Sequence, residues 1–327
     1  MDEMENRQID DINVSDEGEA IIVPKIYKTE PKIVKWWNKV GIAWAFMIPF
    51  LVFFVLFAVI PVVSSLYYCF TYFNMVESAT FNGLENFRYM LMDDEIFGLA
   101  FKNTFVLALL TGPTSYVLSF LFAWMVNNLK HKSFFVVAFY TPTMVSGTAV
   151  SVIWMVLFNN TRYGYLNYAL LKLGLISEPI AFTATKGWIV PIIVIISLWL
   201  GLGSNFLIFF AGLQNCRKEL YEAAYLDGMS NIWQELWYIT LPMMKPQLLY
   251  TMITSITAAF SVGDICTTVA GNPSPDYCVH TLVLHIADMS GTRYEMGYAC
   301  ALSIVVFAIT FLLGRLSMKL LSSKDEL

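Results

Sequence analysis

The sequence predicts an all-α protein that crosses a membrane six times, with both termini in the cytoplasm. Of its 327 residues, 57% are hydrophobic and 14% are charged, whereas charged residues make up about 25% of an average soluble domain. The charges gather in the first forty residues and in short gaps between long apolar runs. A helix needs about 20 residues to cross a bilayer, and each run reaches that length. This pattern is typical of a polytopic membrane protein.

Six apolar runs are expected to form the membrane-spanning helices, after a polar tail at residues 1–38. The acidic start of this tail favours disorder, and Trp36 and Trp37 are expected to anchor its end at the membrane interface. The fifth run is the least hydrophobic because it is rich in Thr and Ser. The six predicted spans are Val40–Tyr67, Asn103–Val126, Ser133–Phe158, Trp188–Ala211, Gln247–Ala270 and Met296–Met318.

The distribution of Lys and Arg predicts the orientation, since these residues are enriched in cytoplasmic segments. With the N-terminus inside, the inner segments, together with Arg315 near the inner end of the sixth span, hold 14 of the 20 basic residues, and the outer segments hold six. The segments 127–132, 212–246 and 319–327 then face the cytoplasm. The outer segments are 68–102, 159–187 and 271–295, and they carry acidic residues such as Glu77, Glu85, Asp93, Asp94 and Glu95. The predicted organisation is a tail at 1–38, a first span with its outer loop at 39–94, a core at 95–320 and a short tail at 321–327.

Several classes of function are disfavoured by what the sequence lacks. There is no basic cluster of the kind that binds nucleic acid, and the five cysteines show no metal-binding spacing. A disulfide between Cys266 and Cys278 stays open as an alternative, because both lie near the outer face. His280 and His285 lack further ligands for a metal ion. No catalytic grouping and no GxxxxGK[ST] phosphate loop is found, so we expect neither catalytic residues nor a cofactor or metal held by this chain.

The inner segment at 214–246 has the signature of two short helices. Glu219–Leu226 is rich in good helix formers, and Gly228 is a plausible stop because glycine accepts the left-handed conformation at a helix end. Asn231, with Gln234 three residues later, resembles a capping box that opens a second helix. Pro242 and Pro246 then interrupt the chain before the fifth span.

Such a loop offers a partner protein both a flat face and charge. Ala223 and Ala224 allow close approach, and Glu222 and Asp227 provide carboxylates for cationic or backbone donors. From these residues alone, a simple connecting loop with high helix propensity remains an equal alternative.

The same loop resembles the Glu-Ala-Ala loop of binding-protein-dependent ABC importers. The family pattern is Glu-Ala-Ala, a Gly four residues after the second Ala, and then Ile-x-Leu-Pro. Here it is matched by Glu222-Ala223-Ala224, Gly228 and Ile239-Thr240-Leu241-Pro242. A wider match that includes Tyr221, the Asp227-Gly228 pair and Lys245-Pro246 is similar to the carbohydrate branch. Arg217 departs from the pattern, where the family often has Pro. The resemblance covers roughly residues 95–320.

The resemblance implies a type I ABC importer fold and the role of permease, in which the loop docks as a coupling helix on a separate ATPase. It implies a bacterial plasma membrane, a homologous second permease, two ATPase subunits that bind ATP and Mg, an extracytoplasmic binding protein, a sugar substrate and membrane lipid. The implied coupling residues are Glu222, Ala223, Ala224, Asp227, Gly228, Leu241 and Pro242.

The fifth span carries polar residues at helical spacing, namely Thr251, Thr254, Thr257, Ser261, Asp264 and Thr268. On one helix they share a face, and a polar face in a membrane must meet the bundle interior, a partner helix or water. Two interpretations stay open, because hydroxyls also bond their own backbone or join helices. Asp264 favours the interpretation as a solute path, since a carboxylate there needs water, a partner or a ligand.

In the maltose-type permeases that this chain resembles, spans four and five contact the sugar. The resemblance implies contacts at Leu200, Gly201, Ser204, Thr254, Thr257, Ala258 and Ser261, and the polarity of the spans adds Asn205 and Asp264. This chain lacks the aromatic and Asn contacts of that pattern, which suggests a smaller or weaker pocket.

Two other functions remain as alternatives. The same scaffold is compatible with import of a polyol phosphate or another non-sugar solute. A six-span secondary transporter is less well supported, because an ion-coupled carrier predicts more buried charge than Asp264 alone.

Overall fold

The structure is a computed structural model that describes residues 13–14, 20–21, 41–145 and 147–321 of the chain. Two compact units are distinguished, Met1–Pro61 and Val62–Leu327, and each is described by itself. The predictions for the tails at 1–38 and 321–327 lie outside the described residues, except for Leu321 and an antiparallel strand pair, β1 (Asn13–Val14) with β2 (Ala20–Ile21).

The first unit holds most of the apolar segment predicted at Val40–Tyr67. Helix α2 (Ile42–Phe54) continues into the π-helical turn η2 (Val55–Val59) and then into α3 (Ile60–Tyr68), which enters the second unit. The stretch Trp44–Tyr68 is 25 residues long and apolar enough to cross a membrane. The first predicted span is therefore a continuous helical segment.

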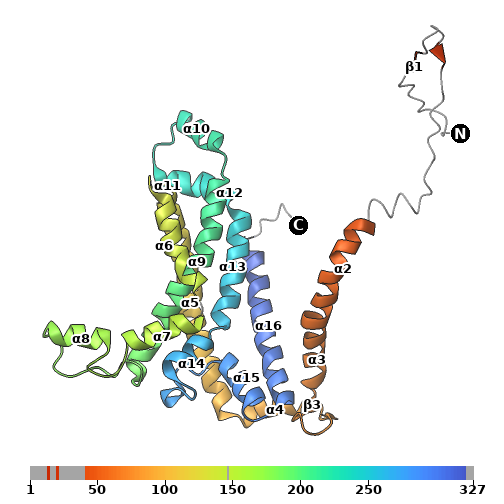
Figure 1. Ribbon diagram of the computed structural model, residues 1–327, viewed down its shortest axis with the longest axis vertical. Coiled ribbons are helices and arrows are strands. Elements are labelled where there is room, and N and C mark those ends of the chain that lie inside the picture. Colours follow the sequence, from red (N-terminus) through yellow and green to blue (C-terminus); the bar gives the residue numbers. More distant parts are fainter. Residues whose placement is uncertain (1–12, 15–19, 22–40, 146, 322–327) are drawn as a thin grey trace. The chain divides into compact units, whose positions relative to one another are not determined.

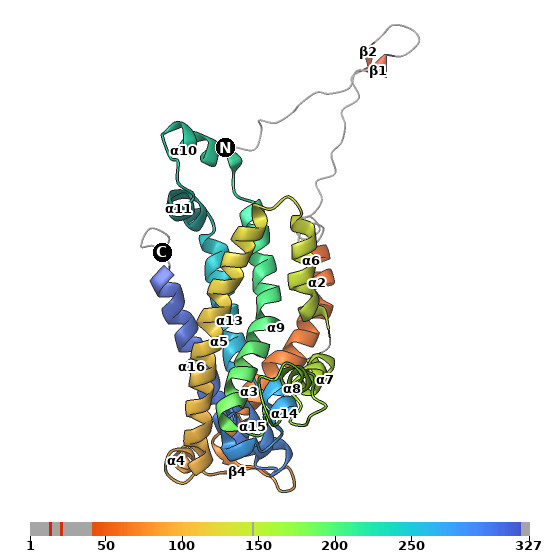
Figure 2. The same cartoon turned by 90° about the vertical axis from the view of Figure 1, so that its left-hand side faces the viewer.

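Four long helices form the body of the second unit, and α5, α9 and α13 run side by side (Figures 1 and 2). Aromatic side chains fill the space between them, with Phe206 and Phe209 fully buried. Packed rings of this size contribute a large share of the buried apolar area. The four helices are α5 (Glu95–Asn127), α9 (Lys186–Gln214), α13 (Lys245–Phe260) and α16 (Met296–Leu321).

Small residues allow these helices to approach closely. A Cβ added at Gly112 of α5 would lie 3.3 Å from the Cβ of Ala259 on α13, and one added at Gly201 of α9 would lie 2.9 Å from Oγ of Ser115. Membrane helices associate through close van der Waals contact of this kind, which is why small residues are enriched between them. Side chains at either glycine would push α5 away from its neighbours.

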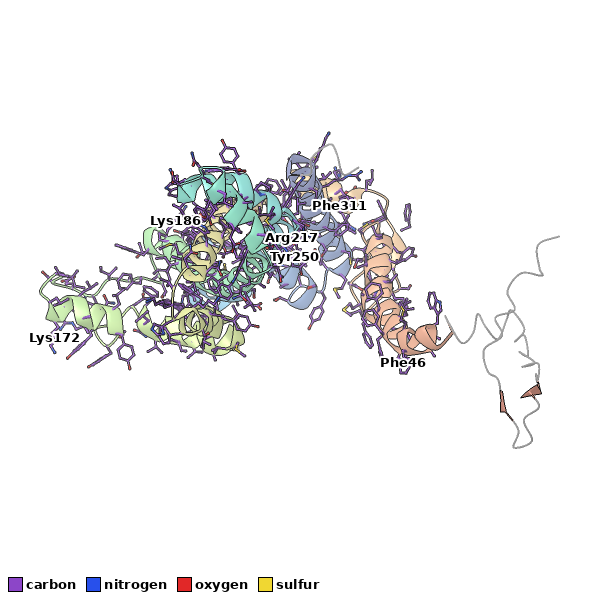
Figure 3. The ribbon with its side chains drawn as sticks, turned by 90° about the horizontal axis from the view of Figure 1, so that it is seen from above. Phe46, Lys172, Lys186, Arg217, Tyr250 and Phe311 are labelled. Atoms are coloured by element: carbon purple, nitrogen blue, oxygen red, sulfur yellow. The ribbon has the colours of Figure 1, made fainter. Side chains whose placement is uncertain are left out.

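The third predicted span is bent rather than straight. Helix α6 (Lys132–Met144) is followed by α7 (Gly147–Leu157), and the two axes differ by 98°. Five helices in the described residues are long and apolar enough to cross a membrane, or up to six if this bent pair counts as one span. Beyond α7, the short helix α8 (Tyr165–Lys172) extends away from the bundle with Lys172 at its outer end (Figure 3).

The fifth predicted span differs from expectation because it is interrupted. α13 ends at Phe260, and α14 (Asp264–Ala270) begins only after the non-helical residues Ser261–Gly263. The segment Lys245–Ala270 is long and apolar enough to cross a membrane, as predicted, but the helix is broken within it, so its six polar residues do not share one face of an uninterrupted helix. Gly263 adopts φ −140° and ψ −55° at the start of α14, outside the helical region.

The second unit has two distinct ends (Figure 1). The loop end carries the elements that the predicted inner segment 214–246 forms. They are α10 (Lys218–Leu226), α11 (Ile232–Glu235), the π-helical turn η3 (Leu236–Thr240) and α12 (Leu241–Met243). The opposite end carries the antiparallel pair β3 (Thr71–Tyr72) with β4 (Thr80–Phe81), then α4 (Glu85–Met92), η4 (Pro275–Tyr277) and α15 (Leu282–Gly291).

Candidate functional site

Helix α10 at the loop end closes as the sequence predicts. Gly228 has φ +91°, the left-handed region that glycine occupies without steric cost. Its N–H donates to the carbonyl of Tyr225, and the N–H of Met229 donates to the carbonyl of Ala224. This pair of bonds is a Schellman motif, which satisfies carbonyls that a helix end otherwise leaves unpaired. The predicted cap at Asn231 is also present, since its side chain accepts from the N–H of Trp233 at 3.0 Å.

Hydrogen bonds join α10 to the segment that follows it. The hydroxyls of Tyr221 and Thr240 lie 3.1 Å apart, and the hydroxyl of Tyr225 donates to a carboxylate oxygen of Glu235 at 2.8 Å. Burial raises the pKa of Tyr221 to about 12, so its hydroxyl remains a neutral hydrogen-bonding group. The ring of Trp233 lies 5.7 Å from that of Trp124 on α5. These contacts join the helices of the segment 214–246 into one unit, which we call the braced loop, and this unit contacts the end of a long helix.

Most of the predicted coupling residues are open to a partner. Glu222, Ala223, Asp227, Gly228 and Pro242 are exposed, whereas Ala224 and Leu241 are half-buried. Leu241 packs against the aromatic core instead of facing outward.

Sequence reasoning missed the apolar part of this surface. Leu226 is 89% exposed, and Tyr238 is 75% exposed. Both belong to the helices of the loop end, Leu226 to α10 and Tyr238 to η3, and they add apolar area to its exposed surface. The signal was available in the sequence, because Leu226 follows the two alanines within the same short helix.

The predicted solute-path residues divide into an open set and a packed set. We call the exposed members, Ser204, Thr257, Ala258, Ser261 and Asp264, the open face. Leu200, Gly201 and Thr254 are half-buried. The open face comes from α9, α13 and α14, and two of these share a core, because Leu200 of α9 and Ile265 of α14 pack on the same hydrophobic cluster.

Asn205 and Thr251 belong to the packed set and do not contribute to the open face. The side-chain amide of Asn205 donates to the hydroxyl of Ser255 at 2.9 Å, which links α9 to α13 inside the bundle. Thr251 is fully buried. Thr251 and Thr257 lie on the same helix, α13, and helical spacing predicted that they share a polar face, but Thr251 is buried whereas Thr257 is exposed.

A polar cluster at the opposite end was not predicted. Asp94 caps the first turn of α5 through the N–H groups of Ile96 and Phe97. The same carboxylate lies 2.8 Å from Nε2 of His285 on α15, and it accepts from the hydroxyl of Tyr298 on α16 at 2.5 Å. Its partners are 191 and 204 residues away in the chain, so no local pattern in the sequence could reveal the cluster.

The pKa values of Asp94 and of His280, whose ring lies next to that of His285, are shifted. Burial alone would raise the pKa of Asp94, but the hydrogen bonds from Tyr298 and His285 outweigh it and hold the pKa below its usual value. Burial lowers the pKa of His280, with a further contribution from His285, whose ring lies 5.6 Å away. His280 is 2% exposed, and neither ring nitrogen has a hydrogen-bond partner. Its neutral form is therefore the one compatible with this packing.

The part of the chain that the structure describes contains no group of three His, Cys, Asp or Glu side chains that could hold a metal ion. The five cysteines, including Cys266 and Cys278, are free thiols. The alternative of a disulfide between those two residues is therefore not realised here.

Comparison with known proteins connects this architecture to one family. The family model "Binding-protein-dependent transport system inner membrane component" matches residues 104–324. Relatives include the probable ABC transporter permease protein YesP of Bacillus subtilis, 30% identical over 83% of this chain and 87% of that protein. The arabinooligosaccharides transport system permease protein AraP of the same organism is 29% identical over 88% and 90%. The lactose transport system permease protein LacF of Rhizobium radiobacter is 28% identical over 83% and 91%.

Solved structures share the fold. A chain of a bacterial ABC transporter involved in the import of the acidic polysaccharide alginate superimposes with a TM-score of 0.73 at 21% identity, over 88% of this chain and 99% of that chain. The same kind of transporter in complex with an alginate pentasaccharide-bound periplasmic protein gives a TM-score of 0.74 at 20% identity, over 88% and 96%. With the family model covering most of the chain, this protein belongs to the family of binding-protein-dependent transport system inner membrane components.

Proposed function

We propose that this chain is the membrane-spanning permease subunit of an ATP-driven importer that passes a sugar or oligosaccharide into the cytoplasm by alternating access. Relatives named for the transport of arabinooligosaccharides, lactose and multiple sugars support the class of substrate. The chain is a transport subunit in this proposal, and ATP with Mg binds to a separate ATPase.

The observation that carries the proposal is the braced loop at 214–246. Helix α10 ends at Gly228, and the hydroxyls of Tyr221 and Tyr225 bind Thr240 of η3 and Glu235 of α11, so that the loop moves as one unit when a partner displaces it. The exposed Glu222 and Asp227 offer acceptors to cationic groups of an ATPase, and the exposed Leu226 offers apolar area. The proposed coupling residues are Glu222, Ala223, Ala224, Asp227, Gly228, Leu241 and Pro242.

The proposed assembly contains a homologous second permease, two ATPase subunits and an extracytoplasmic binding protein in a bacterial plasma membrane. The proposal has six spans, with α6 and α7 as one bent span, and a core at 95–320. An even number of spans leaves both termini on the same side of the membrane, and the proposal assigns that side and the loop end to the cytoplasm. The opposite end then faces the binding protein. The proposed solute path uses the open face with Leu200, Gly201 and Thr254 beside it, and Asn205 acts behind it as a packing residue.

A polyol phosphate is the second candidate substrate class. It is supported by similarity to the sn-glycerol-3-phosphate transport system permease protein UgpA of Agrobacterium fabrum, 27% identical over 72% of this chain and 79% of that protein.

The test is co-purification of the chain from its native membrane, with Glu222→Lys compared with Glu219→Lys. Both residues are exposed on α10, so the control matches the change of charge. The proposal expects an ATPase and a second permease to accompany the wild type and the control, and expects Glu222→Lys to lose the ATPase. A wild-type chain that purifies alone and still transports would overturn the proposal.

A further inference from the structure

The interruption between α13 and α14 brings a single charged side chain to the open face. Within Lys245–Ala270 the only charged residues are Lys245 and Asp264, and within Lys186–Gln214 the only one is Lys186. About 24 Å of helix lies between Lys245 and Ser261 at a rise of 1.5 Å per residue. Within these two segments, Asp264 is therefore the charge nearest to the interruption along the chain.

Because the Asp264 carboxylate is exposed on a segment that is apolar enough to span a bilayer, only a few kinds of surroundings are compatible with its charge. A charged side chain at membrane depth faces a bundle interior, a water-filled cavity or a partner, because hydrocarbon cannot solvate it. Asp264 and its neighbours Ser261 and Thr257 are exposed in the single chain. The surface they form is thus one that water, a solute or a second subunit covers.

The hydroxyls on this surface already donate their protons to backbone carbonyls. Thr257 donates to the carbonyl of Ile253 at 3.0 Å, and Ser261 donates to the carbonyl of Thr257 at 2.8 Å. Beside the path, Thr254 donates to the carbonyl of Thr251 at 3.0 Å. The hydroxyl oxygens keep lone pairs that point outward, and a carboxylate only accepts hydrogen bonds. The open face therefore offers acceptors and needs a solute that brings donors.

We propose that Asp264, together with Ser261 and Thr257, selects for an uncharged polyhydroxylated solute and against an anionic one. Solute hydroxyls donate to the carboxylate and to both hydroxyl oxygens. A phosphate, sulfonate or uronate brings further acceptors and a negative charge that Asp264 repels in a medium of reduced dielectric. This inference rests on the proposed importer function and deepens it, because it favours neutral sugars over polyol phosphates and acidic polysaccharides.

The test measures the field at the open face with small charged thiol reagents, so the identity of the cargo is not needed. Ser261→Cys is made in the wild-type background and with Asp264→Asn, in the complete transporter in native membranes. Reaction rates are measured for an anionic sulfonatoethyl and a cationic trimethylammonioethyl methanethiosulfonate, each normalised to its rate with a free thiol. Protein without an added cysteine gives the background of the five native thiols.

A control cysteine at Ala184, which is exposed outside the spans, reports any general effect of Asp264→Asn. The proposal expects the cationic reagent to react about tenfold faster at Ser261→Cys, and this ratio to fall severalfold with Asp264→Asn while it stays constant at Ala184→Cys. An unchanged ratio, or a cysteine at 261 that reacts with neither reagent while that at 184 reacts, overturns the proposal.

The same membranes separate this inference from the proposed function. If the charge ratio behaves as expected but no ATPase co-purifies with the chain, the importer proposal fails, and what stands is a negative field from Asp264 at position 261. If the ATPase is present and the ratio is unchanged, the importer proposal stands and Asp264 does not select by charge.

Discussion

At the scale of single residues, Gly228 is the position where backbone conformation matters most. Its φ of +91° is the left-handed region, and nothing lies within 4 Å of the place where a Cβ would be added. A substitution there is strained through the backbone alone and not through a clash. This separates the role of glycine as a helix stop from any role in close packing.

We expect Gly228→Val to destabilise the loop by about 2 kcal/mol and Gly228→Asn by much less, because asparagine tolerates the left-handed region whereas a β-branched residue does not. Limited proteolysis of the loop in the membrane-embedded protein measures the difference. Equal protease sensitivity of the two variants would show that the Schellman motif is not what closes α10.

The stability of the protein is expected to depend on pH through His280. Because the pKa of His280 is lowered, the packed form binds fewer protons than an opened form. The packed form therefore becomes less stable relative to the opened form as pH falls below the ordinary histidine pKa of about 6.5. The groups that face it are His285 and Asp288 of α15, Asp94 before α5, and Arg293. The lowered pKa of Asp94 acts in the same direction at lower pH, because its stabilising charge is lost only as pH falls through that pKa.

We expect the melting temperature to drop between pH 7.5 and pH 5.5 in the wild type, and the drop to shrink in His280→Phe. Phenylalanine keeps a ring against Tyr277 and His285, whose centroids lie 5.4 and 5.6 Å away, but it has no site for a proton. The drop is measured by thermal unfolding in detergent at both pH values. An identical drop in both proteins would place the acid-sensitive group elsewhere.

At the scale of elements, α9 and α13 are joined by a polar contact where the sequence suggested a solute contact. The amide of Asn205 donates to Ser255 inside the bundle. The polar interruption in span four was recognisable, but which of its residues point inward depends on how α9 rotates against α13. That rotation follows from tertiary packing, including the close approach of Gly203 to Phe139 and Thr143 of α6.

A double-mutant cycle tests this contact. We expect a coupling free energy between Asn205→Ala and Ser255→Ala of about 0.6 kcal/mol and at most about 2 kcal/mol, the range for hydrogen bonds between membrane helices. Unfolding in mixed detergent micelles supplies the four free energies. Additive effects would show that Asn205 is held by packing and not by its partner hydroxyl.

At the scale of the whole molecule, local patterns predict the elements and long-range contacts decide the site. Spans near Trp188–Ala211 and Met296–Met318 agree with α9 and α16 because length and hydrophobicity alone define them. The size of the bend between α6 and α7 and the interruption after Phe260 were not predicted. Pro142 lies inside α6, and Gly263 precedes α14, but prolines and glycines elsewhere in the spans leave helices intact, so their presence alone does not locate a break.

Asp94 shows how few contacts hold distant segments of the second unit together. One carboxylate caps α5 and also binds His285 of α15 and Tyr298 of α16. Hydrogen bonds to a charged group are worth about 1.5–3 kcal/mol each, and removing the charge from a buried cluster leaves its donors without a strong acceptor.

We expect Asp94→Asn to lower the free energy of unfolding by about 3 kcal/mol, whereas the adjacent, exposed Asp93→Asn has an effect within about 0.5 kcal/mol. Thermal unfolding of both variants in the same detergent provides the comparison. Hydrogen exchange then tests the mechanism, because the loss should appear at the N-terminal turn of α5, in α15 and at the start of α16 together. Protection lost only at the α5 turn would mean that Asp94 acts as a helix cap, and that α15 and α16 are held to α5 by apolar packing instead.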